Sequence, residues 1–246
     1  KQLSPKKQEI REREATLLDV GGQMLIERGY LGLTMDRIAD AVGVSKGTVY
    51  QHFANKEDLL AAVALRSADT RASLFERAAA FRGTSRERMG AVGAAAEVFF
   101  SLYPHHEQAE RAIRASSLSQ KISPKRALSL ESCTFRCFGV ATGIARDGIA
   151  SGDLVLHGDR TVEQLCVGLW NLYIGAFLMR DLENFIDEPF MNDPMPTLLG
   201  NAQIFLDGFG WKALSTEHDY SASRLRVLTE VFPNEAREAG LLQATH

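Results

Sequence analysis

The sequence predicts an all-α protein with a small N-terminal three-helix domain and a larger C-terminal helical bundle. Apolar residues recur at spacings of three and four along nearly all of the 246 residues, whereas the alternating pattern of a half-buried strand is sparse. Hydrophobic residues make up 45% of the chain, which is ample for a packed core, and the length allows one or two domains.

We expect four segments along the chain, divided where the helical pattern is interrupted near residues 82–85. They are 1–55, an N-terminal arm and three-helix domain; 56–82, a connecting helix; 83–214, a helical bundle; and 215–246, a C-terminal helical extension.

The first helix is expected over residues 8–28, ending at Gly29. The N-terminal arm, which overlaps the start of this helix, is basic (Lys1, Lys6, Lys7, Arg11 and Arg13), although the whole chain carries a net charge of −3. Any attraction to a polyanion must therefore be local. The arm either follows phosphates or is a solvated tail.

A second, short helix follows Thr34, whose hydroxyl is placed to accept a hydrogen bond from an unpaired backbone N–H. Ile38, Ala41 and Val42 are spaced to share one face of it. Gly43 is expected to end it, because glycine takes a positive φ at little cost.

Ser45 is expected to cap a third helix over residues 46–53, with Val49 and Phe53 facing inward. The remaining side chains would then face outward or lie at the flanks; these are Lys46, Gly47, Thr48, Tyr50, Gln51 and His52.

This outward face carries chemistry suited to a DNA groove. Gly47 costs about 1 kcal/mol in a helix relative to alanine, which close approach of the backbone to DNA would explain. Thr48 and Gln51 suit base edges, and Tyr50 and His52 suit phosphate oxygens. Asn55 is placed to cap the next helix, with Lys56 in its first turn.

The stretch from Leu33 to Leu60 closely resembles the N-terminal signature of the TetR family of bacterial regulators. The resemblance implies a helix-turn-helix, a DNA operator as partner, and DNA contacts at the matching positions Thr34, Lys46, Gly47, Thr48, Tyr50, His52 and Lys56. To these we add Ser45 and Gln51. The resemblance also implies a homodimeric, ligand-responsive regulator, most simply a repressor that a small molecule releases from a palindromic operator.

In the bundle, helices are expected over 56–81, from about 85 to Pro104, over 130–149, from 159 or 161 to about 184, over about 198–209 and from about 221 to Pro233. Residues 116–129 are serine-rich and contain Pro124, which indicates an irregular segment.

One of these helices, residues 161–184, is apolar nearly all round, which is typical of a helix buried on two sides. With the helix that follows it, it would form a four-helix dimer interface, as the resemblance also implies; burial in the protein's own core is the alternative. The expected interface residues are Leu165, Leu169, Leu172, Ala176, Leu198, Ala202, Phe205 and Phe209.

Large aromatic side chains in the bundle either enclose a cavity for an apolar or aromatic small-molecule effector or form an ordinary core. The candidates are Phe99, Tyr103, Arg136, Trp170, Tyr173 and Phe177.

We find no catalytic motif, and expect no enzyme activity, cofactor or metal. Cys133 and Cys137 lie one helical turn apart, so a redox- or metal-responsive regulator stays open, as does, more remotely, an enzyme built on the bundle. No signal peptide or membrane-spanning run is evident, so we expect a cytoplasmic protein without membrane contact.

Overall fold

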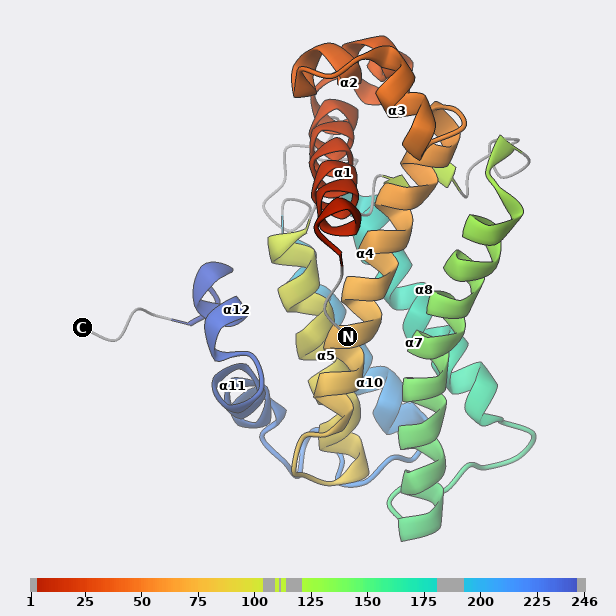
Figure 1. Cartoon of the computed structure of the whole chain (residues 1–246). Helices are drawn as coiled ribbons and strands as arrows, with labels where there is room; N and C mark the ends of the chain where they lie inside the picture. Colours follow the sequence, from red (N-terminus) through yellow and green to blue (C-terminus); the bar gives the residue numbers. More distant parts are fainter. Residues whose placement is uncertain (1–3, 104–108, 111, 114–120, 181–192, 243–246) are drawn as a thin grey trace. The chain divides into compact units, whose positions relative to one another are not determined.

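The computed structural model describes residues 4–103, 109–110, 112–113, 121–180 and 193–242. Most of these residues are helical, with no strand among them and a single isolated bridge between Leu154 and Trp211 (Figure 1). The expected all-α class is confirmed. No helix in the described ranges is long and apolar enough to cross a membrane.

The chain divides into two compact units, and each draws on two separate stretches of sequence. The first contains residues 1–72 and 103–135, and the second contains 73–102 and 136–246. This grouping differs from the four consecutive segments expected, because the long helices α4 (Lys56–Ala79) and α7 (Pro124–Ser151) each contribute to both units.

The first unit begins with α1 (Pro5–Gly32), α2 (Met35–Val42) and α3 (Lys46–His52). Gly29 interrupts α1 at φ 63°, which matches the helix end expected there. The core of this first unit is built from apolar side chains of these helices and of α4, among them Leu17, Leu33, Ile38, Val49, Phe53 and Leu59.

One local expectation in this unit is wrong, and one of the two alternatives for the basic arm is excluded. Ala41 is exposed, and the buried stripe of α2 runs through Met35, Ile38 and Ala39 instead. The described part of the basic arm is not a tail, because Pro5 starts α1 and glutamates alternate with the basic residues; Arg13 pairs with Glu9 at 2.6 Å.

Residues 124–129 are also helical rather than irregular. Pro124 is the first residue of α7, where its fixed φ suits a helix start and its missing N–H costs nothing. Of the expected irregular segment, residues 116–120 lie outside the described residues.

The second unit contains α5 (Ser85–Leu102), α8 (Val162–Arg180), α10 (Met195–Gly208), α11 (Tyr220–Glu230) and α12 (Pro233–Glu238), with the ends of α4 and α7. α8 packs on α10, and both α11 and α12 pack on α5. Thr161 caps α8, accepting from the Gln164 N–H at 3.1 Å. Of the expected reach of α8, residues 181–184 lie outside the described residues.

The C-terminal extension is tied to the bundle by ion pairs. Arg224 makes two hydrogen bonds of 2.6 Å to the buried Glu97 of α5, and Arg77 of α4 donates to Glu235 of α12. Bidentate guanidinium–carboxylate pairs fix geometry as well as adding energy. α11 therefore forms part of the second unit.

Candidate nucleic-acid interface and effector cavity

The N-terminal caps of α2 and α3 are formed by the residues expected for that role. The Arg37 N–H donates to Thr34 Oγ1 at 3.3 Å, and the Thr48 N–H donates to Ser45 Oγ at 3.1 Å. Gly43 ends α2 with φ 74°. Thr34 and Ser45 thus set the entry of two consecutive helices, and their hydroxyls are already engaged.

α3 is amphipathic. Val49 and the following Phe53 are fully buried, whereas Lys46, Gly47 and Gln51 are exposed and Tyr50 is 45% exposed. Thr48 and His52 are half-buried at the flanks. One short helix therefore presents a continuous polar surface, the shape that a major groove admits.

Lys46 is held by the carboxylate of Asp36, which lies in the first turn of α2. Its Nζ lies 2.6 Å from Asp36 Oδ1, and this hydrogen bond raises the pKa of Lys46. Because both side chains are exposed, a phosphate can replace the carboxylate at little cost.

Gly47 has no structural need to be glycine. A methyl group there would meet only Ser45 Oγ, at an ordinary contact distance of 3.7 Å. The absence of a side chain leaves the α3 backbone open to whatever lies against it.

Lys56 begins α4 next to Tyr30. Its Nζ donates to the Tyr30 carbonyl at 3.3 Å and lies 4.0 Å from the ring centroid. The Tyr30 hydroxyl donates to Glu57 at 2.6 Å, and burial together with this bond raises the pKa of Tyr30 to about 12. Lys56 is half-buried, so its ammonium is positioned by the protein itself.

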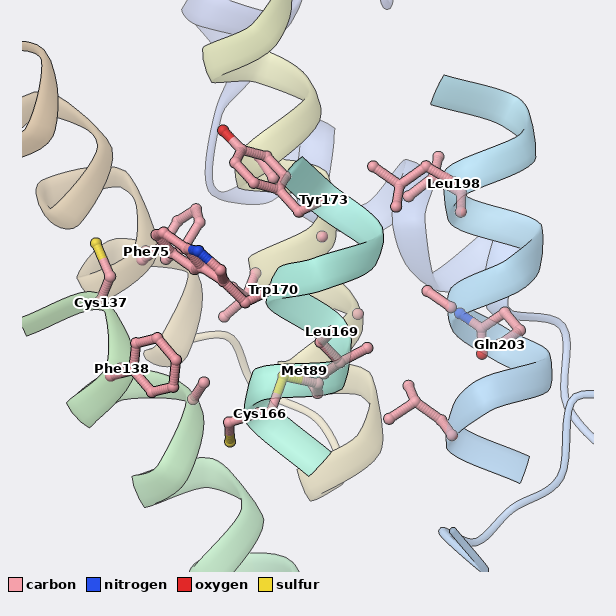
Figure 2. A pocket seen from close by; sticks show the side chains of 18 residues that line it. Phe75, Met89, Cys137, Phe138, Cys166, Leu169, Trp170, Tyr173, Leu198 and Gln203 are labelled. Atoms are coloured by element: carbon pink, nitrogen blue, oxygen red, sulfur yellow. The ribbon is translucent and has the colours of Figure 1, made fainter. Parts of the chain in front are cut away.

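The second unit contains a cavity of about 120 Å³ lined almost entirely by apolar side chains, which we call the effector cavity (Figure 2). Its walls come from α4, α5, α7, α8 and α10, and include Phe75, Met89, Phe138, Leu169 and Leu198. Functional ligand pockets are usually about 300–1,000 Å³, so a ligand of ordinary size must displace some of these side chains.

Two of the six expected ligand residues line this cavity: Trp170 and Tyr173. Phe99 is buried elsewhere in α5, and Arg136 makes a bidentate ion pair with Glu76 at 2.9 and 3.0 Å. Tyr103 belongs to the other unit. The side chain of Phe177 lies outside the described residues.

The sequence analysis missed Phe75, Leu199 and Gln203, which also line the cavity. They lie on α4 and α10, far in sequence from the aromatic residues of α8. The packing of α10 on α8 brings Leu199 and Gln203 to the cavity, and Phe75 reaches it from α4.

The cysteines lie in apolar surroundings. Cys133 and Cys137 are buried, and Cys137 and Cys166 line the effector cavity. Burial raises the pKa of Cys166 to about 11, which opposes thiolate chemistry. Among the described residues, no three His, Cys, Asp or Glu side chains are grouped to hold a metal ion.

The expected dimer residues divide into two groups. Leu165, Ala176 and Leu198 are buried within the protomer, so its own core already occupies them. Leu169, Leu172, Ala202, Phe205 and Phe209 are half-buried. The exposed apolar side chains of α8 and α10 are others, namely Val167, Leu178, Met179 and Ile204.

Comparison with known proteins agrees with this architecture. A family model described as bacterial regulatory proteins of the tetR family matches residues 17–63. The HTH-type transcriptional activator FasR of Mycolicibacterium smegmatis is 29% identical over 170 residues, covering 62% of this chain and 76% of that protein. The HTH-type transcriptional repressor KstR2 of Mycobacterium tuberculosis is 36% identical over 52 residues, covering 21% of this chain and 26% of that protein.

Among solved structures, the transcriptional regulator FadR of Bacillus subtilis in complex with stearoyl-CoA has a TM-score of 0.59 and 16% identity. The match covers 76% of this chain and 97% of that one. At this identity the similarity establishes a shared fold.

Proposed function

We propose that this chain, which belongs to the TetR family of bacterial transcriptional regulators, is a homodimeric repressor that a small apolar ligand releases from a palindromic operator. The observation that carries the proposal is α3, whose capped and buried inner side leaves Lys46, Gly47, Tyr50 and Gln51 exposed together. This role requires no catalysis and places the protein in the cytoplasm with its DNA.

Each of the two α3 helices would enter a major groove, with the two grooves about one helical turn, roughly 34–36 Å, apart. Lys46 and Tyr50 would bind phosphates, while Gln51 and the methyl group of Thr48 would read base edges. The other proposed DNA contacts mainly position α3 on the duplex and do not read bases. They come from Lys56, Thr34, Ser45 and His52.

Dimerisation is proposed through α8 and α10. Ile204 is 69% exposed and Val167 is 45% exposed, which is unfavourable unless a partner covers them. Phe205 packs onto α8 at Gly168, where a methyl group would come within 2.2 Å of the ring. The two helices thus offer one joint apolar face, which a second copy would complete.

The ligand is proposed to enter the effector cavity. Since this cavity is smaller than most ligand sites, the ligand must favour a conformation in which it is wider. Phe75 lines the cavity and lies on α4, the same helix that begins at Lys56. α4 is therefore the proposed route by which occupancy changes DNA affinity.

The body of the ligand is proposed to be an acyl-type or similar apolar chain. The lining supports this, and the B. subtilis regulator of the same fold is in complex with stearoyl-CoA. We propose repression of transcription and not activation; the named relatives include both an activator and a repressor. Expression of a reporter gene placed behind the operator distinguishes the two.

The test begins by selecting duplexes from a random library with the purified chain. Binding of the selected duplex is then measured by fluorescence anisotropy. Lys46→Ala and Tyr50→Ala should each weaken binding by about tenfold or more. Lys125→Ala and Phe135→Ala remove the same groups at exposed positions on α7 and should bind like the wild type. Unchanged binding by both α3 variants would refute the interface.

A further inference from the structure

A second cavity lies beside the effector cavity, between α5, α10 and α11. Its volume is about 440 Å³, and we call it the polar chamber. Gly90, Leu199 and Gln203 line both cavities. These three residues therefore form a common wall.

The wall is thin at Gly90. A methyl group built on this residue would meet no other side chain or backbone atom within 4 Å. Glycine in mid-helix is unfavourable, and here no close packing within the protomer requires it. The gap leaves room for a ligand to pass from one cavity to the other.

Gln203 is the polar group of the wall, and its orientation is fixed. Its Oε1 accepts from Arg86 Nη2 at 3.1 Å, and Arg86 is fully buried and paired with Asp207 at 2.6 Å. Because arginine only donates, the carbonyl side of the amide must face it and the NH₂ group must face away. Figure 2 shows Gln203 reaching from α10 toward the effector cavity. The wall thus offers amide donors to a ligand.

Among the side chains that line the polar chamber, carboxylates outnumber cations; His218 and Arg226, which do not line it, each lie 3.7 Å from Glu87. Three carboxylates line the chamber, from Glu87, Glu97 and Asp193, against the single guanidinium of Arg224. Arg224 is taken up by its bidentate pair with Glu97, which is buried.

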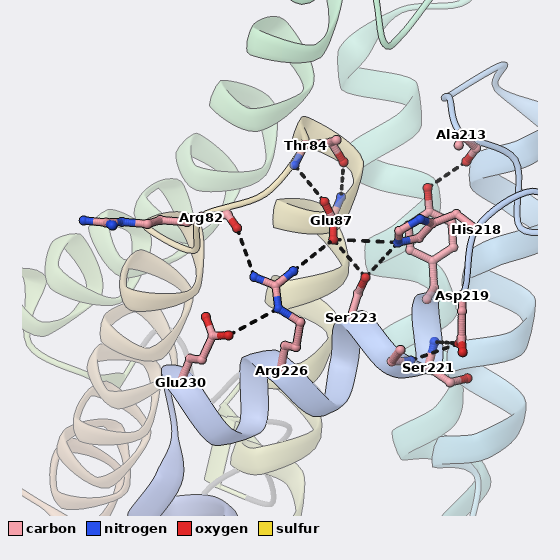
Figure 3. Close-up of polar contacts among 12 residues, drawn as sticks. Arg82, Thr84, Glu87, Ala213, His218, Asp219, Ser221, Ser223, Arg226 and Glu230 are labelled. Carbon is pink, nitrogen blue, oxygen red and sulfur yellow. Dashed lines mark hydrogen bonds and ion pairs between the residues drawn. The ribbon is translucent and has the colours of Figure 1, made fainter.

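Glu87 is held as a carboxylate by other groups (Figure 3). The Ser223 hydroxyl and the Thr84 N–H donate to it, each at 2.9 Å, and the Arg226 guanidinium lies 3.7 Å away. Burial alone would raise the pKa of Glu87, but these hydrogen bonds outweigh it and the pKa is lowered. Its negative charge is therefore retained, and because Arg224, the guanidinium among the lining residues, is already paired with Glu97, an anion entering the chamber would meet carboxylates without an available cation.

We infer that the effector is an amphiphile whose apolar body fills the effector cavity and whose polar, non-anionic end passes Gly90 into the polar chamber, accepting a hydrogen bond from Gln203. This inference rests on the proposed ligand response and specifies its ligand class. It places the C-terminal helix α11 in the ligand site. It also predicts a head group unlike the anionic one of stearoyl-CoA.

The first experiment compares decan-1-ol with decanoate at pH 8, following the fluorescence of Trp170, which lines the effector cavity. We expect the alcohol to bind at least tenfold more tightly. Glu97→Gln should reduce this preference at least fivefold, because it frees Arg224 to meet the carboxylate. Glu230→Gln is the matched control, since it makes the same change on the part of α11 that pairs with Arg226, and it should keep the preference.

The second experiment tests the passage and does not depend on the buried Glu97–Arg224 pair. Gly90→Leu should weaken decan-1-ol binding at least tenfold while benzene, which fits within the effector cavity, still binds. Gly139→Leu is the control, because Gly139 is an exposed helical glycine of α7 with equally open surroundings.

The outcomes separate this inference from the proposed function. If decan-1-ol and benzene both fail to change the Trp170 signal, the proposed ligand response fails along with the inference. The inference alone is overturned if decan-1-ol binds but decanoate binds as tightly. It is also overturned if Glu97→Gln leaves the preference for the alcohol unchanged, or if Gly90→Leu leaves decan-1-ol binding unchanged.

Discussion

Replacing Gly47 with alanine should make the protein more stable and a worse DNA binder. Gly47 lies in the first turn of α3, and an added methyl group would meet only Ser45 Oγ at 3.7 Å. Glycine in a helix costs roughly 0.5–1 kcal/mol relative to alanine, so the free energy of unfolding should rise by up to that amount. The corresponding rise in melting temperature is about 1–4 °C.

DNA binding should change in the opposite direction. If the α3 backbone lies against the duplex, a methyl group must push the helix away from its phosphate and base partners. We expect a loss of at least tenfold, about 1.4 kcal/mol or more, in the affinity for the selected duplex.

The assay combines calorimetric melting with anisotropy titration at a fixed salt concentration, because phosphate contacts make affinity salt-dependent. Gly139→Ala is the control, because it replaces another exposed helical glycine in open surroundings. The free energy of unfolding of this variant should rise by a similar amount, while its DNA affinity should not change. Wild-type affinity in Gly47→Ala would show that DNA does not approach this backbone, and the orientation assigned to α3 would be wrong.

Three other changes test separate parts of the structure. Gly43→Ala should destabilise the protein by about 1–2 kcal/mol in urea unfolding, because residue 43 has φ 74° and non-glycine residues are strained there; an unchanged midpoint would contradict that geometry. Glu110→Gln should cost roughly 3–5 kcal/mol in the same assay, since it removes the carboxylate to which the buried Arg71 donates at 2.8 and 3.0 Å; a loss below 1 kcal/mol would argue against the pair. Glu87→Gln should cost about 1–3 kcal/mol at pH 7. Because folding lowers the pKa of Glu87, its contribution is present above the unfolded pKa of about 4.3 and is lost as the pH falls through the lower pKa of the folded state, so wild type and variant should converge as the solution is acidified; a difference in unfolding free energy that does not change with pH would refute the assignment.

The sequence predicted the DNA-binding motif in detail because its signals are local. A cap hydroxyl, a glycine with positive φ and two apolar residues one turn apart act within a few residues, as Thr34, Gly43 and the pair Val49 and Phe53 show. Where the prediction failed, a neighbouring helix decided the outcome. Ala41 is as apolar as Ala39, but only Ala39 faces the core.

The proposed ligand site could be predicted only in part, because it depends on contacts between distant segments. Aromatic residues on α8 indicated Trp170 and Tyr173, but nothing local shows that Phe75 of α4 and Gln203 of α10 face the same cavity. The proposed dimer face illustrates the same limit. Because α8 is apolar all round, its sequence does not reveal which side the protomer's own core covers. In the structure Val167 is exposed, whereas Leu165 is buried.

Hydroxyl-radical footprinting on the selected duplex tests the central claim most directly, namely that two copies of α3 read one palindrome. The wild-type chain should protect two equivalent regions about one helical turn apart, related by the symmetry of the site, and Tyr50→Ala should lose both together. A single protected region, or two regions that survive this substitution, would contradict the account.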